Sequence, residues 1–162
     1  SGHKHNIYDH TLKIDADYYE HVDADGLATG EKEAVEGTPF DFRTPVKIGE
    51  RVEVDHPQLK LGNGFDHHFF FTTDKNQVVL EDEESGRRLT VSTTLPGAQI
   101  YTANYLDGRI GKNGEPYNAR DAVCIETQNL PDAIHIEKNP STILRKGETF
   151  DAQTSYCLEV IK

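Results

Sequence analysis

Short apolar runs recur along the whole chain, and turn-forming residues separate them. Runs of this length that are rich in Val, Ile, Phe, Tyr and Thr are typical of β-strands. No window longer than about ten residues has a helical period. The pattern therefore predicts an all-β fold, an antiparallel β-sandwich or barrel, with no helix of three or more turns in residues 58–160. The predicted strands are residues 11–14, 18–22, 68–73, 77–82, 87–94, 98–103, 123–125 and 152–160.

Three connections between these runs carry further signals. Residues 83–86, Glu-Glu-Ser-Gly, join two predicted strands and indicate a β-hairpin. Residues 37–42 are expected to be extended, with Pro39 near the start, where a strand tolerates proline. Residues 107–115 contain three glycines and predict an exposed loop. The chain is therefore expected to alternate short strands with tight turns.

The chain is acidic, with 17 Lys and Arg residues against 28 Asp and Glu residues and a formal net charge of −11. This balance disfavours nucleic acids and anionic membranes as partners, because both attract clustered Lys and Arg. No apolar run approaches the ~20 residues that span a bilayer, and no secretory signal is visible at the start. A length of 162 residues fits one domain or part of a larger one.

Hydrophobic residues make up 35% of the chain, which fits either a shallow core with many turns or a piece of a larger fold. The two cysteines, Cys124 and Cys157, lie on predicted strands. We interpret them as reduced core residues of a cytoplasmic protein, and the sequence leaves a disulfide open. Neither cysteine has a base beside it in the sequence, so a catalytic thiol is not expected.

Glu126 follows the apolar run 123–125 and precedes a strand breaker at 129–132. It is therefore predicted at the mouth of a strand, where a sheet can aim a carboxylate into a cleft. Its flanks predict partial burial, which raises the pKa of a carboxyl group toward the range that suits general acid–base catalysis. The competing interpretation is a solvated carboxylate at a strand end.

Asp66 and Gln99 are the other two candidate site residues. Asp66 precedes a predicted strand in Gly-Phe-Asp-His, and Gln99 lies near the start of residues 98–103. A carboxylate accepts hydrogen bonds from ligand hydroxyls, and an amide both donates and accepts them. The competing interpretations are a turn residue that bonds nearby backbone for Asp66, and an outward polar strand residue for Gln99.

No spacing of Cys and His matches a zinc motif, so the sequence predicts no metal site. His67 and His68 are adjacent and are expected to face opposite sides of a strand. His3 and His5 are interpreted as part of a terminal tail. No phosphate loop, dinucleotide fingerprint or serine-nucleophile motif is present, so no cofactor is predicted.

The order of several motifs resembles the C-terminal half of the aldose 1-epimerases, also called galactose mutarotases. The specific motifs are Gly-Phe-Asp-His, which contains Asp66, and Glu-Thr-Gln, which begins at Glu126. Other segments that resemble the family are residues 9–12, 37–43, 95–102, 104–108, 129–132 and 140–145.

The resemblance implies a large antiparallel β-sandwich with a sugar cleft on one face. It implies an isomerase that interconverts the α and β anomers of free aldoses such as galactose and glucose. On this analogy Glu126 is the general base that removes the anomeric hydroxyl proton, while Asp66 and Gln99 bind sugar hydroxyls. The ring then opens, the carbonyl rotates, and closure gives the other anomer. The resemblance implies no cofactor and no metal.

One part of the family's machinery has no match in this chain. The family's general acid is a histidine in the N-terminal half, assisted by a second histidine and an arginine, and none of His3, His5 or His10 matches it. Residues 1–3 resemble the stretch that follows the acid's own motif. We therefore expect residues 1–162 to be one β-sandwich domain or its C-terminal portion, nearly inactive alone, with the N-terminal half as a further segment or partner chain.

Three alternatives stay open from the sequence. The first is a non-catalytic carbohydrate-binding β-sandwich that keeps Asp66 and Gln99. The second is a relative that acts on phosphorylated sugars, which requires basic residues such as Arg87 and Arg88 around the cleft. The third is a purely structural β domain, which burial of Glu126 against backbone donors would favour.

Overall fold

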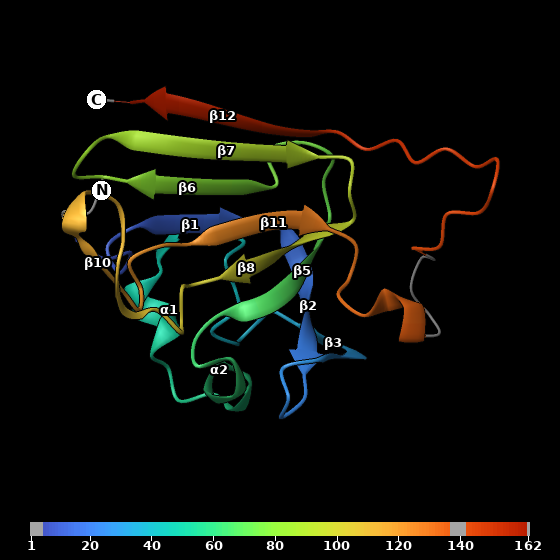
Figure 1. The fold of residues 1–162 in the computed structure, drawn as a ribbon, viewed down its shortest axis with the longest axis horizontal. Helices are drawn as coiled ribbons and strands as arrows, with labels where there is room; N and C mark the ends of the chain where they lie inside the picture. Colours follow the sequence, from blue (N-terminus) through green and yellow to red (C-terminus); the bar gives the residue numbers. More distant parts are fainter. Residues whose placement is uncertain (1–4, 137–141, 162) are drawn as a thin grey trace.

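Two five-stranded antiparallel sheets dominate the computed structural model, which describes residues 5–136 and 142–161 (Figure 1). The first sheet has the order β12-β7-β6-β1-β4, and the second has the order β11-β8-β5-β2-β3. A separate two-stranded ribbon pairs β9 with β10. His3 and the first two residues of the segment 140–145 lie outside the described residues.

The first sheet contains β1 (Thr11–Ile14), β4 (Val46–Lys47), β6 (Val78–Asp82), β7 (Arg87–Thr93) and β12 (Thr154–Val160). The second contains β2 (Ala16–Val22), β3 (Ala28–Ala34), β5 (Asp66–Phe71), β8 (Gly97–Tyr101) and β11 (Cys124–Gln128). The ribbon contains β9 (Asp107–Ile110) and β10 (Pro116–Asn118). The short helices are α1 (Gly49–Val52), α2 (Pro57–Gly62), η1 (Lys112–Gly114) and η2 (Ala133–His135).

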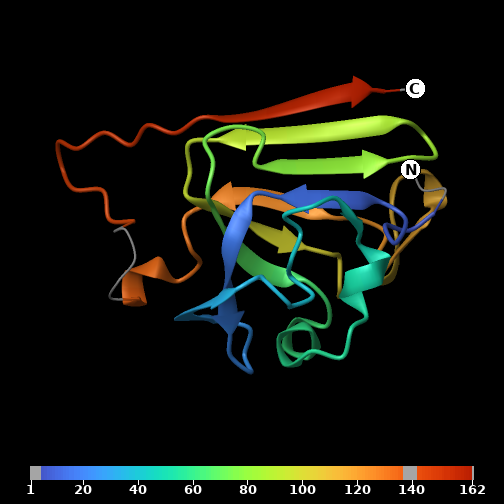
Figure 2. The same ribbon diagram turned by 180° about the vertical axis from the view of Figure 1, so that it is seen from behind.

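The chain passes directly from one sheet to the other between β1 and β2, with a single residue, Asp15, between them. Figure 2 shows the sharp change of direction at this point. The backbone N–H of Asp15 donates to the carbonyl of Gln77, and its own carbonyl accepts from Thr72. These bonds tie the corner to a neighbouring segment of each sheet.

The all-β prediction is confirmed, because both large sheets are antiparallel. Among the described residues of the range 58–160, no helix is longer than α2, which has six residues. The predicted hairpin is β6–β7, with Val78 paired to Val91 and Asp82 paired to Arg87. Two local predictions are wrong. Residues 37–42 form hydrogen-bonded turns rather than a strand. Residues 107–115 are largely exposed, as predicted, but they contain β9 and η1 rather than a simple loop.

The core lies between the sheets and is rich in aromatic side chains. The rings of Tyr19 and Phe40 stack with centroids 3.8 Å apart, and Phe65 packs edge-on against Phe40 at 5.3 Å. All three residues are fully buried. Phe40 lies in the segment that was expected to be extended, so the turns of residues 37–42 serve to insert a ring into the core. Buried aromatic rings of this size contribute strongly to the stability of a fold.

The sequence pattern did not predict β3, an edge strand with the sequence Ala-Thr-Gly-Glu-Lys-Glu-Ala. Charged residues are common on edge strands, because they discourage pairing with another chain. The two cysteines are free, as interpreted, but the prediction that they are core residues is wrong. Cys157 is exposed on the edge strand β12, and Cys124 is only half-buried. Within the described residues, no helix has the length and apolar content to cross a membrane.

Candidate functional site

Three adjacent strands, β5, β8 and β11, place the candidate residues on one side of the second sheet. Glu126 pairs with Gln99, and Gln99 in turn pairs with His68. Asp66 pairs with Tyr101 in the same ladder. Directly opposed residues of an antiparallel sheet point to the same side. We call this side the candidate face; it carries Asp66, His68, Gln99, Tyr101 and Glu126.

The opposite side of the same three strands contributes to the core. His67 and Ile100 are fully buried there, and Ile125 packs against the core cluster. Successive side chains of a strand point to opposite sides. The burial of Ile125 therefore applies to the core side of β11. It does not indicate that the side chain of Glu126, on the opposite side, is buried.

Glu126 is exposed in the middle of β11. Two predictions about it are therefore wrong: it does not lie at a strand mouth, and its carboxylate is not partly buried. The structural-domain alternative required Glu126 to be buried against backbone donors, and its exposure removes that support. The carboxylate is available to a ligand that approaches the candidate face.

Asp66 and Gln99 contact each other directly. The side-chain amide of Gln99 donates from Nε2 to Oδ1 of Asp66 over 2.9 Å. This bond fixes the orientation of the amide, so its carbonyl oxygen Oε1 is directed away from Asp66. Oε1 is buried and has no hydrogen-bond partner. A buried acceptor without a partner is costly, and a ligand hydroxyl can satisfy it.

The turn before β5 explains the Gly-Phe-Asp-His motif. Gly64 has a φ angle of +126°, and a Cβ atom there would lie 2.6 Å from Oδ1 of Asn104 and 2.8 Å from Nη2 of Arg120. The amide of Asn104 donates to the carbonyls of Gly62 and Phe65, and Arg120 donates to Asn104 over 2.7 Å. Only glycine fits this conformation and this space, so the motif fixes the point at which β5 begins.

Buried His67 anchors the first residue of β5 from the core side. Its Nδ1 accepts a hydrogen bond from the backbone N–H of Asp66 over 3.0 Å, and its Nε2 lies 3.3 Å from Oε1 of Gln58. The same oxygen accepts from the backbone N–H of Val22. Burial lowers the pKa of His67 to about 3, so the ring is neutral and can accept at Nδ1. This network holds Asp66 in place.

His68 lies on the candidate face, although sequence reasoning did not single it out as a site residue. Its side chain is buried, and neither ring nitrogen has a partner. The ring packs edge-on against Phe70 and occupies the space above Gly97, where a Cβ atom would lie 2.4 Å from Nε2. Burial lowers its pKa to about 4. His68 is two residues after Asp66 on the same strand, so the sequence could have predicted that both side chains point to the same side of the sheet.

Cys124 lies beside the candidate carboxylates. Burial raises the pKa of its thiol, and the negative charges of Glu126 and Asp66 raise it further. A thiol in this environment stays protonated and is a poor nucleophile. Cys124 is therefore not a candidate nucleophile.

The arginines required by the phosphorylated-sugar alternative lie elsewhere. Arg87 and Arg88 belong to β7 of the first sheet, and Arg88 is held by an ion pair with Glu81 over 2.5 Å. Neither residue lies on β5, β8 or β11. Their position gives no support to a phosphate site on the candidate face.

Comparisons with known proteins agree with the fold and the motifs. The family model for aldose 1-epimerase matches residues 1–157. A galactose mutarotase from Homo sapiens is 42% identical over 159 residues, which cover 96% of this chain and 45% of that protein. The chain belongs to the aldose 1-epimerase family.

Solved structures give the same result. A Caenorhabditis elegans homologue of the aldose epimerases superimposes with a TM-score of 0.87 and 26% identity, over 97% of this chain and 47% of that one. A galactose 1-epimerase from Lactobacillus acidophilus gives a TM-score of 0.73 and 28% identity, over 95% and 45% of the two chains. The chain thus spans less than half the length of these relatives.

Proposed function

We propose that this chain supplies the carboxylate half of the active site of an aldose 1-epimerase that acts on free aldoses such as galactose and glucose. The observation that carries the proposal is the coupled arrangement of Asp66, Gln99 and Glu126 on one sheet face. A hexose presents an array of hydroxyl groups, and these three side chains offer an array of acceptors with one amide donor.

In this proposal Glu126 is the general base. Its exposed carboxylate removes the proton of the anomeric hydroxyl, and the electron pair left on that oxygen forms the carbonyl as the bond to the ring oxygen breaks. Rotation about the bond to the carbonyl carbon, followed by ring closure, gives the other anomer. Glu126 returns its proton to the new anomeric oxygen, so the residue is unchanged after each turnover.

Asp66 and Gln99 are positioning groups in this proposal. The hydrogen bond between them leaves Oε1 of Gln99 as an acceptor for a hydroxyl, and the second carboxylate oxygen of Asp66 as another. Charged acceptors bind hydroxyls more strongly than neutral ones. We therefore assign sugar orientation to this pair and proton transfer to Glu126.

The ring oxygen must receive a proton as the ring opens. His68 lies on the same face, but its buried ring with a pKa of about 4 is neutral near pH 7 and is a poor source of that proton. The proposal therefore assigns the general acid to a histidine of the part of the family fold that this chain does not span. Polarimetry with the 162-residue chain alone is expected to show almost no acceleration of mutarotation.

The positioning role is tested in a full-length epimerase that includes this chain. Asp66→Asn is expected to raise KM for galactose by about tenfold with a smaller change in kcat, because a neutral amide weakens hydroxyl binding. Asp107→Asn, on the separate β9–β10 ribbon, is a matched control that should leave both constants unchanged. An unchanged KM in Asp66→Asn would contradict the assignment. Sugar binding without any catalysis by the intact protein would favour the carbohydrate-binding alternative.

A further inference from the structure

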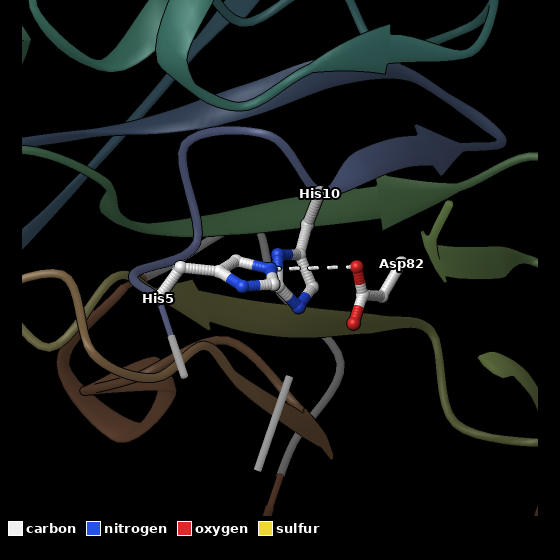
Figure 3. Close-up of side chains that lie close together, drawn as sticks. All are labelled: His5, His10 and Asp82. Atoms are coloured by element: carbon white, nitrogen blue, oxygen red, sulfur yellow. Dashed lines mark ion pairs between the residues drawn. The ribbon is translucent and has the colours of Figure 1, made fainter. Parts of the chain in front are cut away.

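A second cluster of ligand-type side chains lies on the first sheet, at the end of the β6–β7 hairpin. One ring nitrogen of His5, one of His10 and one carboxylate oxygen of Asp82 all lie within 4.8 Å of one another. Figure 3 shows the two imidazole rings next to each other, with Asp82 facing them. The ring centroids of the two histidines are 5.7 Å apart.

The sheet itself places two of these three residues. Thr11 of β1 pairs with Glu81 of β6, so His10 and Asp82 are the next residues along the two paired strands. The backbone N–H of His10 donates to the carbonyl of Ile7 over 3.1 Å, which turns the chain back on itself. This turn brings His5 to the same end of the sheet. The arrangement follows from strand register and one tight turn.

Ser85 and Glu84 contact two of the three residues of the cluster, Asp82 and His5. Ser85 donates to Oδ2 of Asp82 over 2.7 Å, while Oδ1 lies 3.5 Å from Nε2 of His5. On the other side of the His5 ring, Nδ1 lies 3.3 Å from a carboxylate oxygen of Glu84. A ligating histidine commonly has a carboxylate on its second nitrogen, which orients the ring and increases its basicity. Glu84 is in the position of such a partner.

His10 supplies an independent observation. Its side chain is 7% exposed, and its Nδ1 is buried without a hydrogen-bond partner. A buried imidazole nitrogen without a partner is costly for the fold, and a cation can satisfy it.

The surroundings are acidic. A cavity of about 330 Å³ at this position is lined by His5, Asp9, Lys47, Asp82, Glu83 and Glu84. Its one cationic lining residue apart from the histidine, Lys47, forms an ion pair with Asp9 over 2.8 Å. The lining carries four carboxylates in all, and such an acidic surrounding favours the approach of a divalent cation.

We propose that His5, His10 and Asp82 form a zinc-binding site that ties residues 5–10 to the β6–β7 hairpin. Two imidazoles and a carboxylate suit Zn²⁺, which takes nitrogen and oxygen ligands at about 2.0–2.2 Å and accepts water at a fourth position. Two ligand atoms on one such ion are at most about 4.4 Å apart. His5, whose side chain is a quarter exposed, closes the remaining gap by a small movement.

The sequence prediction of no metal site rested on the absence of a zinc motif. The three ligands come from the segment that precedes a turn, the residue before β1 and the last residue of β6, so no fixed sequence spacing connects them. The proposal concerns a structural cation and is independent of the proposed sugar chemistry, which takes place on the other sheet.

Isothermal titration of untagged chain with Zn²⁺ tests the proposal. We expect one Zn²⁺ per chain and a rise in melting temperature on binding. His5→Ala and Asp82→Asn should each weaken binding by at least about tenfold, and Glu84→Gln should weaken it by about tenfold or more through the orientation of His5. His135→Ala, an exposed histidine on η2, is the matched control and should bind as the parent does.

Two results would overturn the site. One is no binding of Zn²⁺ by the folded parent chain at millimolar concentration. The other is stoichiometric binding that His5→Ala and Asp82→Asn both leave unchanged, since this would place the ion elsewhere. His5 lies near the start of the described chain and outside both sheets, so its replacement is expected to leave the fold intact, which circular dichroism checks.

Discussion

The two ends of the first sheet differ in how completely the chain covers its own apolar residues. Strand register places four leucines in one row across β1, β6, β7 and β12: Leu12, Leu80, Leu89 and Leu158. Leu12 is fully buried, Leu80 and Leu89 are half-buried, and Leu158 is 80% exposed. Residues of one type on one side of one sheet thus range from core to surface. The alternation of residues along each strand determines which side of the sheet is apolar. The elements that pack against that side determine how deeply each leucine is buried.

The largest expected effect of a single substitution lies in the aromatic core between the sheets. Phe40→Ala removes a ring that stacks on Tyr19 and packs against Phe65, and it should lower the free energy of unfolding by about 3–5 kcal/mol. Chemical denaturation followed by circular dichroism measures this change. A loss below about 1 kcal/mol would mean that the aromatic cluster is not the main core.

Acid should destabilise the second sheet, through two buried histidines of β5. His67 and His68 are buried, and burial lowers their pKa values to about 3 and about 4 from an ordinary 6.5. The unfolded chain therefore takes up protons first, so their contribution to stability is complete above pH 6.5 and is lost as the pH falls toward 4. Between these limits each histidine adds a slope of about 1.4 kcal/mol per pH unit.

Replacement of one histidine measures how much that residue contributes to the pH dependence of the free energy of unfolding. His68→Gln should reduce the pH dependence of the free energy of unfolding by about 1.4 kcal/mol per pH unit near pH 5. His135→Gln, which replaces an exposed histidine, should leave the slope unchanged. Equal slopes in parent and His68→Gln would show that His68 is not buried as a neutral ring.

The smallest expected effect lies at the exposed end. Leu158→Ser should change the free energy of unfolding of this chain by no more than about 0.5 kcal/mol, because the side chain is already 80% exposed. Thermal melts of the two variants compare it directly with Phe40→Ala. A loss of several kcal/mol from Leu158→Ser would remove the contrast between the buried core and the exposed edge strand.

Much of the fold followed from the sequence, because most strands carry a clear apolar run. The hairpin β6–β7 was predicted nearly residue for residue. The strand β3 was missed because its composition is set by its place at a sheet edge, which a single segment does not reveal. Residues 37–42 were misassigned because Phe40 and Phe42 alternate as in a strand, whereas their burial comes from turns.

The candidate face was only partly predictable. Motif resemblance singled out Asp66, Gln99 and Glu126, and the strand pairing places all three on one side of the sheet. The burial of Glu126 was mispredicted because Ile125 faces the core, on the opposite side of β11. The zinc cluster was not predictable, since turn geometry and strand register bring together residues that are far apart in the sequence.

The role of Glu126 as the base is the central claim, and polarimetry tests it most directly. A full-length epimerase that includes this chain is mixed with freshly dissolved α-galactose, and the rate is compared with those of Glu126→Gln and Glu159→Gln. We predict that Glu126→Gln lowers kcat by roughly 10²–10⁴, the usual contribution of one positioned acid–base group, while Glu159→Gln on β12 has no effect. An unchanged rate in Glu126→Gln would contradict the assignment.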